Sequence, residues 1–162
     1  MIKILVMDVD GTLTDGKIYI GSSGESFKAF SVQDGYAIKN ILPRYNIIPV
    51  IITTRCSAIV EQRCKELNIQ DVYQDCKNKK ETLLDIVGTY GIHCNENGVF
   101  PGVAYIGDDL PDLECMKIVE ISGCPQNAVS EVLRISDFVA TKTGGDGAVR
   151  EFIDWIVKLL EK

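Results

Sequence analysis

Residues 2–14 read IKILVMDVDGTLT, and this stretch decides how the rest of the chain is expected to fold. Its first half, residues 2–7, is a short apolar run, which is typical of a central strand in a parallel sheet covered on both faces. The run stops at two acids, Asp8 and Asp10, and at Gly11. Because open parallel sheets bind ligands beyond the carboxyl ends of their strands, we expect both acids to lie at a ligand site.

Strand-like and helix-like segments alternate along the remaining chain. Further strands are expected at residues 49–52, 72–73, 103–106, 120–122 and 138–140, and helices at residues 34–42, 57–67, 78–90, 113–119, 128–135 and 148–160. This alternation predicts an α/β fold, a Rossmann-like parallel sheet with helices on both faces. A β-hairpin of residues 17–20 and 25–31 is expected after the first strand. No linker divides the chain, so we expect residues 1–162 to form one domain.

Local signals place several helix ends. Asp34 is a candidate N-cap for a helix that ends before Pro43. Ser57 is a candidate N-cap for the next helix. Asn78, with Glu81 three residues later, resembles a capping box.

Composition and charge exclude several classes of protein. With 23 acidic residues against 17 basic ones, the net charge is −6, so a nucleic-acid partner is not expected. No apolar stretch reaches the roughly 18 residues that a membrane helix needs, so no membrane partner is expected. The apolar start lacks the length and the small-residue cleavage site of a secretory signal. The six cysteines show no zinc or redox spacing, which favours reduced thiols in a cytoplasmic protein.

Acids and a threonine stand at the ends of three expected strands. They are Asp8 with Asp10, Thr53, and Asp108 with Asp109. Carboxylates packed together raise one another's pKa unless a cation neutralises them. Magnesium prefers oxygen ligands and keeps positions open for phosphate oxygens. The sequence therefore predicts a magnesium site that can act on a phosphate group.

The motif Asp8-Val9-Asp10-Gly11-Thr12-Leu13-Thr14 resembles the nucleophile loop of the haloacid dehalogenase superfamily, whose phosphatases carry Asp-x-Asp-Gly-x-Thr/Val-x-Thr. The resemblance implies that Asp8 attacks phosphorus and becomes an aspartyl phosphate. It also implies that Asp10 protonates the leaving alkoxide and then deprotonates the hydrolytic water. Asp8 and the backbone carbonyl of Asp10 are expected metal ligands, and Gly11 permits close approach of backbone N–H groups to phosphate.

The second and third motifs of the superfamily also have matches. Thr53 corresponds to the Thr or Ser that ends the next core strand. Lys79 corresponds to the lysine of the third motif by its register from Tyr73, with Lys80 as the alternative. A lysine at this place would offset phosphoryl charge and restrain the Asp8 carboxylate.

The fourth motif is matched by Gly107-Asp108-Asp109-Leu110-Pro111-Asp112, which fits Gly-Asp-Asp-x-x-Asp. The resemblance implies that Asp108 binds magnesium directly. Asp109 is expected to act through water or by orienting a ligand, and Asp112 is expected to support the site.

The capless branch of the superfamily is the best match, because only the short hairpin of residues 17–31 follows the first motif and no insert of domain size is present. Within that branch, several stretches are similar to the 3-deoxy-D-manno-octulosonate 8-phosphate phosphatases, namely residues 14–16, 30–36, 60–64, 105–109 and 144–151. The similarity implies a magnesium-dependent phosphatase that acts on a small ulosonate sugar phosphate. Members of this family form homotetramers through their hairpins, so the same assembly is expected.

Two arginines are candidate substrate contacts. Arg55 follows Thr53-Thr54, where the octulosonate enzymes have Thr-Gly-Arg, and a guanidinium there can bind the substrate carboxylate. Arg63 borders the apolar face of the next helix. The resemblance favours a substrate or phosphate contact for it, across a subunit boundary as one option, and an exposed surface role is the alternative. Thr54 and Gln33 replace a Gly and a common Arg of the family, which leaves the exact sugar open.

Other functions remain as alternatives. A phosphatase of nonulosonate 9-phosphates, the sialic acid type, would carry the same catalytic groups. A non-catalytic oligomerisation domain, like the one attached to some cytidylyltransferases, is disfavoured by the complete set of motifs. A phospho-accepting receiver domain would need an Asp at the end of residues 47–53, where Thr53 stands instead.

Overall fold

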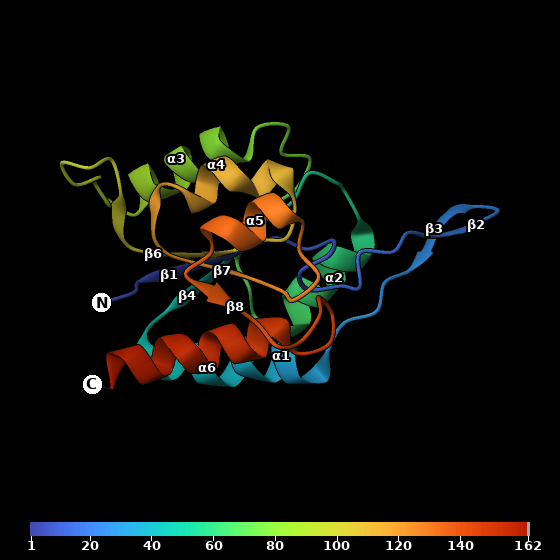
Figure 1. Ribbon diagram of the computed structural model, residues 1–162. Coiled ribbons are helices and arrows are strands. Elements are labelled where there is room, and N and C mark those ends of the chain that lie inside the picture. Colours follow the sequence, from blue (N-terminus) through green and yellow to red (C-terminus); the bar gives the residue numbers. More distant parts are fainter. Residues whose placement is uncertain (162) are drawn as a thin grey trace.

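The computed structural model describes residues 1–161, whose fold is built on one six-stranded sheet (Figure 1). The strands are β1 (Ile4–Met7), β4 (Ile48–Ile52), β5 (Asp71–Tyr73), β6 (Phe100–Ile106), β7 (Val119–Cys124) and β8 (Phe138–Val139). Their order in the sheet is β5-β4-β1-β6-β7-β8, and every neighbouring pair is parallel. The expected parallel α/β sheet is therefore confirmed.

Helices cover both faces of this sheet. They are α1 (Val32–Tyr36), α2 (Ala58–Glu66), α3 (Lys79–Thr89), α4 (Leu113–Met116), α5 (Ser130–Ile135) and α6 (Ala148–Leu160). Figure 1 shows α3, α4 and α5 on one side of the sheet and α1 and α6 on the other. Side chains alternate along β1. Leu5 packs into the core between the sheet and α6, whereas Ile4 and Val6 pack into the core between the sheet and α3. This two-sided burial explains why the first strand is apolar throughout.

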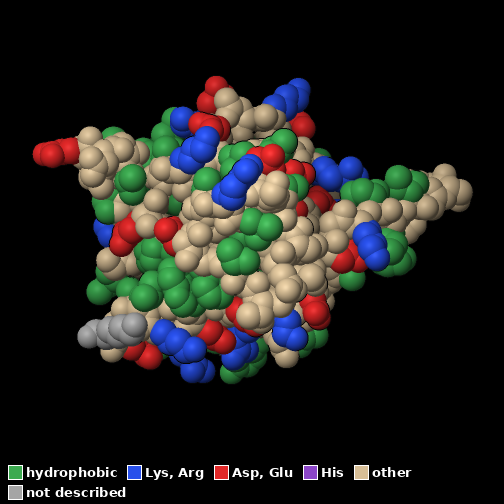
Figure 2. Space-filling view, in the orientation of Figure 1, with side chains coloured by type: hydrophobic (Ala, Val, Ile, Leu, Met, Phe, Trp, Pro, Cys, Tyr) green, Lys and Arg blue, Asp and Glu red, His purple; other side chains and the backbone are tan. Residues whose placement is uncertain are grey.

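The β-hairpin consists of β2 (Tyr19–Gly21) and β3 (Gly24–Phe27) and projects from the body (Figure 1). Its rings of Tyr19 and Phe27 stack with their centroids 4.3 Å apart. Ile20 is 74 % exposed and Phe27 is 55 % exposed. Figure 2 shows this arm carrying hydrophobic side chains out into solvent. The hairpin predicted from the sequence is confirmed, although its strands are shorter than expected.

Three helix ends differ from the sequence-based expectation. Ser31, not Asp34, caps α1, because the Ser31 hydroxyl accepts a hydrogen bond from the backbone N–H of Asp34, which lies within the helix. The helical segment also runs past Pro43, because Pro43 stands at the start of a 3-10 turn, where it needs no N–H donor. Ser57 does precede α2, but its hydroxyl donates to Glu25 of the hairpin instead of capping the helix.

Two expectations drawn from composition can be compared with the described residues. The six cysteines are all free thiols. Among residues 1–161, no helix combines the length and the apolar character needed to cross a membrane.

Candidate active site

The carboxyl ends of three adjacent strands meet at one edge of the sheet. Met7 of β1 pairs with Ile51 of β4 and with Ile106 of β6, so the residues that follow these strands converge. The cleft formed there is lined by Asp8, Asp10, Gly16, Thr53, Thr54, Lys79, Asp109, Pro111 and Asp112. Asp8, Asp10 and Thr53, which follow the ends of β1 and β4, therefore line one cleft, as expected from the position of ligand sites in parallel sheets.

Lys79 lies between two buried carboxylates of the cleft. Its Nζ is 2.5 Å from Oδ1 of Asp8 and 2.7 Å from Oδ1 of Asp112, and its side chain is only 3 % exposed. Burial lowers the pKa of Lys79, but the attraction of Asp8 and Asp112 outweighs burial and raises it. Lys79 therefore keeps its charge. Lys80 is partly exposed and lies 3.8 Å from Glu114 instead, so Lys79 is the lysine that reaches the cleft.

Asp112 is held from several directions. Its Oδ1 accepts hydrogen bonds from Lys79 and from the Tyr105 hydroxyl at 2.7 Å each. Its Oδ2 accepts from the backbone N–H of Asp108 at 3.1 Å and of Asp109 at 3.3 Å. With both oxygens engaged, Asp112 braces the loop after β6 and orients Lys79. Tyr105, which sequence reasoning missed, is a hydroxyl-bearing side chain inside an otherwise apolar strand, and that was its only local signal.

The charge of the cluster fits a divalent cation. Asp8, Asp108 and Asp112 each offer an oxygen within 4.8 Å of the others. Burial, followed by repulsion from Asp112, raises the pKa of Asp8 well above its usual value, and burial raises the pKa of Asp108 to about 6. When all three carboxylates are ionised, they exceed the single ammonium of Lys79 by two negative charges. Mg²⁺ would balance them, and all-oxygen ligands are the kind that it prefers.

The loop after β1 packs tightly against this cluster. Gly11 has a φ of +98°, and a Cβ at this position would collide with the Asp108 carboxylate. The Thr12 hydroxyl donates to Oδ1 of Asp108 at 3.0 Å. The loop that contains Gly144 and Gly145 packs against the Gly11 loop. A Cβ at Gly144 would collide with the backbone oxygen of Gly11, and the N–H of Gly145 donates to the backbone carbonyl of Thr12 at 3.1 Å. Glycine is required at Gly11 by its positive φ and by the Asp108 carboxylate, and at Gly144 by the close approach of the Gly11 backbone.

Asp10 faces the cleft and has a partner that sequence reasoning missed. The Lys28 Nζ, from the end of the hairpin, is 2.5 Å from Oδ1 of Asp10 and 2.9 Å from Oε1 of Glu25. Neither hairpin residue has a local sequence signal, because the contact depends on the path by which the hairpin returns to the body.

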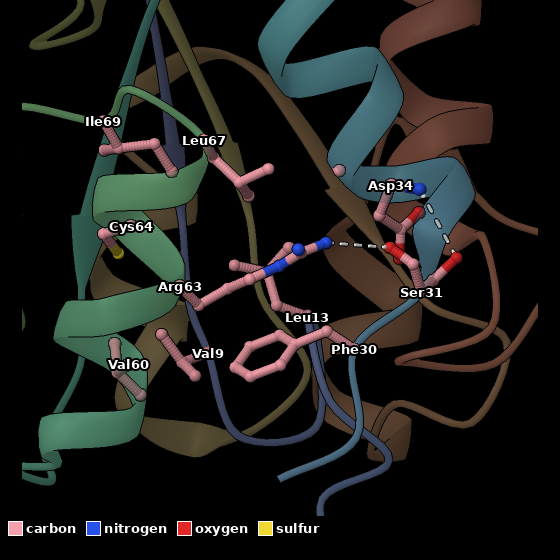
Figure 3. A pocket seen from close by; sticks show the side chains of 11 residues that line it. Val9, Leu13, Phe30, Ser31, Asp34, Val60, Arg63, Cys64, Leu67 and Ile69 are labelled. Atoms are coloured by element: carbon pink, nitrogen blue, oxygen red, sulfur yellow. Dashed lines mark hydrogen bonds between the residues drawn. The ribbon is translucent and has the colours of Figure 1, made fainter.

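The two candidate substrate arginines lie outside the cleft lining. Arg55 is 47 % exposed, with Nη2 3.9 Å from Oε1 of Glu25, so it stands at the rim beside the hairpin. Arg63 does not line the cleft of its own protomer but a separate small cavity, so the expected substrate contact across a subunit boundary stays a prediction. Figure 3 shows its guanidinium crossing a small cavity toward Ser31, whose carbonyl accepts at 3.4 Å. It also lies over the Phe30 ring, which explains why this helix position is filled by a long side chain.

Named relatives and solved structures resemble the chain along nearly its whole length, whereas no protein-family model matches it. The 3-deoxy-D-manno-octulosonate 8-phosphate phosphatase KdsC of Salmonella typhi is 42 % identical over 156 residues, which are 96 % of this chain and 79 % of the relative. The phosphatase of the same name from Yersinia pestis is 37 % identical over 161 residues, covering 99 % and 82 % of the two chains.

Solved structures agree with this similarity. The Moraxella catarrhalis 3-deoxy-D-manno-octulosonate 8-phosphate phosphatase, in complex with magnesium, phosphate and KDO, has a TM-score of 0.88 at 41 % identity, covering 97 % of this chain and 86 % of that one. The cobalt-bound Haemophilus influenzae phosphatase has a TM-score of 0.90 at 32 % identity, covering 99 % and 90 %. The chain belongs to the 3-deoxy-D-manno-octulosonate 8-phosphate phosphatase family of the haloacid dehalogenase superfamily.

Proposed function

We propose that this protein is a magnesium-dependent phosphatase that hydrolyses 3-deoxy-D-manno-octulosonate 8-phosphate through a phosphorylated Asp8. The observation that carries the proposal is the buried Asp8 carboxylate, held by Lys79 at 2.5 Å and facing Asp108 in a cluster with two excess negative charges. The names of the relatives support the substrate. In this proposal, residues 1–162 form one catalytic domain.

The first step is attack by Asp8. One of its carboxylate oxygens forms a bond to phosphorus while the bond from phosphorus to the sugar oxygen breaks, and that oxygen leaves with the electron pair. Lys79 orients the attacking carboxylate and offsets charge on the phosphoryl oxygens. Asp8, Asp108 and the carbonyl of Asp10 would hold Mg²⁺, which would supply further charge neutralisation when bound.

Asp10 serves both halves of the reaction. Protonated Asp10 gives its proton to the departing sugar oxygen. In the second half, its carboxylate takes a proton from water as the water oxygen attacks phosphorus, and the bond between phosphorus and Asp8 breaks. Free phosphate leaves, and Asp8 returns as a carboxylate. Thr53 and Asp109 line the same cleft. The Thr53 hydroxyl would donate to a phosphoryl oxygen, and Asp109 would orient a water or another ligand of the bound metal.

Two arginines and the hairpin bear on substrate selection and assembly. Arg55 at the rim can pair with the carboxylate of a ulosonate. Arg63 lies outside its own cleft, so a contact with substrate requires a neighbouring subunit. The exposed Ile20 and Phe27 of the hairpin support self-association, for which a homotetramer is the proposed form. The proposed setting is the cytoplasm.

Product analysis on a panel of sugar phosphates tests the function. With Mg²⁺, we expect the highest kcat/KM for 3-deoxy-D-manno-octulosonate 8-phosphate and no turnover after chelation of the metal. A preference for a nonulosonate 9-phosphate would move the substrate to the sialic acid type and leave the chemistry intact. Absence of hydrolysis with every phosphomonoester would contradict the proposed function altogether.

A further inference from the structure

The Lys28 side chain is buried although most of the hairpin arm around it is exposed. It is 2 % exposed, whereas the neighbouring Phe27 is 55 % exposed. A buried ammonium is unfavourable unless carboxylates surround it. Two do so here, Asp10 at 2.5 Å and Glu25 at 2.9 Å. Burial lowers the pKa of Lys28, but the bonds to Asp10 and Glu25 raise it by more, so Lys28 stays charged.

Glu25 fixes Lys28 from the other side. Oε1 of Glu25 accepts from Lys28, and Oε2 accepts from the Ser57 hydroxyl. The backbone N–H of Ser57 donates in turn to Oε1 of Gln74 at 2.8 Å. Lys28 is thereby tied to the loop that follows Thr53 and cannot swing freely, although the hairpin itself projects from the body (Figure 1).

Asp10 depends on this lysine for its orientation. Within residues 1–161, the Lys28 ammonium is the one described hydrogen-bond partner of the Asp10 carboxylate, and it occupies Oδ1 only. Oδ2 is left free beside the cleft that Asp8 and Thr53 line. A side chain with one oxygen anchored and the other free is suited to exchange a proton at one defined place.

We propose that Lys28, held by Glu25, is a positioning residue that fixes the Asp10 carboxylate for proton transfer to the leaving group and from water. This inference rests on the proposed function, because it assumes that Asp10 is the general acid and base. It adds a residue of the hairpin to the catalytic machinery of its own subunit.

The leaving group offers a direct test. A sugar alkoxide needs a proton as it departs, whereas p-nitrophenolate is stable without one. In Lys28→Met, we expect kcat for the sugar phosphate to fall about 100-fold, a typical share for a misplaced general acid, with KM unchanged. The first p-nitrophenolate released per site from p-nitrophenyl phosphate should slow less than about threefold.

Two further variants keep the test decisive. Lys17→Met makes the same change at an exposed lysine of the same hairpin and should leave both rates unchanged. The double variant Glu25→Gln with Lys28→Met removes the buried ammonium together with one of its two carboxylate partners. It remains informative if the single variant misfolds, and it should show the same selective loss. Equal slowing with both substrates, or full activity of a folded Lys28 variant, would overturn the role of Lys28. Hydrolysis by the wild type would still support the proposed function in that case. Absence of wild-type hydrolysis would overturn both.

Discussion

Two lysine-centred clusters hold Asp8 and Asp10, the two acids to which we assign the chemistry, and the clusters differ in the elements that anchor them. The core cluster consists of Asp8, Lys79 and Asp112, and the hairpin cluster consists of Asp10, Lys28 and Glu25. In each, one buried ammonium bridges two carboxylates at 2.5–2.9 Å. The acids of the core cluster are 7 % and 1 % exposed, whereas those of the hairpin cluster are 18 % and 20 % exposed.

This difference follows from the elements that supply the residues. The core cluster comes from the end of β1, the start of α3 and the loop after β6, all of which belong to the sheet and its packed helices. The hairpin cluster depends on an arm outside the sheet. The proposed nucleophile Asp8 is therefore held by the folded core, whereas the proposed proton carrier Asp10 is held by an arm outside the sheet. Loss of the core cluster should affect both stability and chemistry, and loss of the hairpin cluster should affect mainly chemistry.

The largest effect is expected from Asp8→Asn. An amide cannot attack phosphorus in place of the carboxylate, so steady-state turnover of the sugar phosphate should fall by about 10⁴-fold or more. The measurement is phosphate release with Mg²⁺ at saturating substrate. Asp109→Asn is the matched control in the same cleft and should retain more activity than Asp8→Asn. If Asp8→Asn were as active as the wild type, Asp8 would not be the nucleophile.

Lys79→Met separates the stability of the two clusters. It leaves the buried Asp8 and Asp112 without their cation, and we expect a loss of about 3–5 kcal/mol in the free energy of unfolding. Urea denaturation without metal measures this loss. Lys80→Met, at the exposed neighbouring position, should change stability by less than about 0.5 kcal/mol. Equal effects of the two variants would mean that the core cluster does not stabilise the fold.

Asp34 shows what burial does to a carboxylate without a lysine. Burial raises its pKa to about 6, while one oxygen accepts from the backbone N–H of Arg150 and the other has no described partner. A raised pKa means that the folded state holds the proton more tightly, so this contribution to stability is lost as pH rises from about 4 to about 6. An Asn side chain does not ionise, so the stability of Asp34→Asn does not decrease with pH at this position. Relative to wild type, the variant should gain about 2 kcal/mol more at about pH 7 than at about pH 4.5, measured by denaturation at both pH values. A pH-independent difference would contradict the assignment.

The smallest effect on stability is expected from Lys28→Met. Water reaches the partly exposed Asp10 and Glu25 once the ammonium is gone, so the free energy of unfolding should fall by only about 1–2 kcal/mol. Urea denaturation next to Lys79→Met makes the comparison direct. A loss as large as that of Lys79→Met would show that the hairpin is as much a part of the core as the sheet is.

The core cluster could be predicted from the sequence, and the hairpin cluster could not. Parallel strands end at one edge, so Asp8 and Asp108 are brought together by topology alone, and Lys79 follows from its register after β5. Lys28 reaches Asp10 only because the hairpin folds back over eighteen residues, and no local pattern specifies that path. The cavity that Arg63 lines could not be predicted for a related reason, because a helix position identifies a face but not the cavity that its side chain reaches.

The helix ends show the same limit on a smaller scale. Asp34 and Ser31 are both acceptable caps, and the sequence alone does not decide which one points back at the backbone. In the structure, Ser31 accepts the N–H of Asp34, and the Asp34 carboxylate is used against α6 instead. Ser57 likewise exchanges a capping bond for one to Glu25. Tertiary partners outweigh local propensity at these positions.

The most direct test of the account is to trap the phosphoryl group on Asp8. Asp10→Asn should still be phosphorylated by p-nitrophenyl phosphate with Mg²⁺, because that leaving group needs no proton, but it should be unable to activate water. Borohydride reduction after acid quenching would then convert the phosphorylated residue to homoserine, which peptide mass spectrometry can locate. We predict homoserine at position 8. Its absence there, in a variant that releases p-nitrophenolate, or its presence at another acid, would contradict the account.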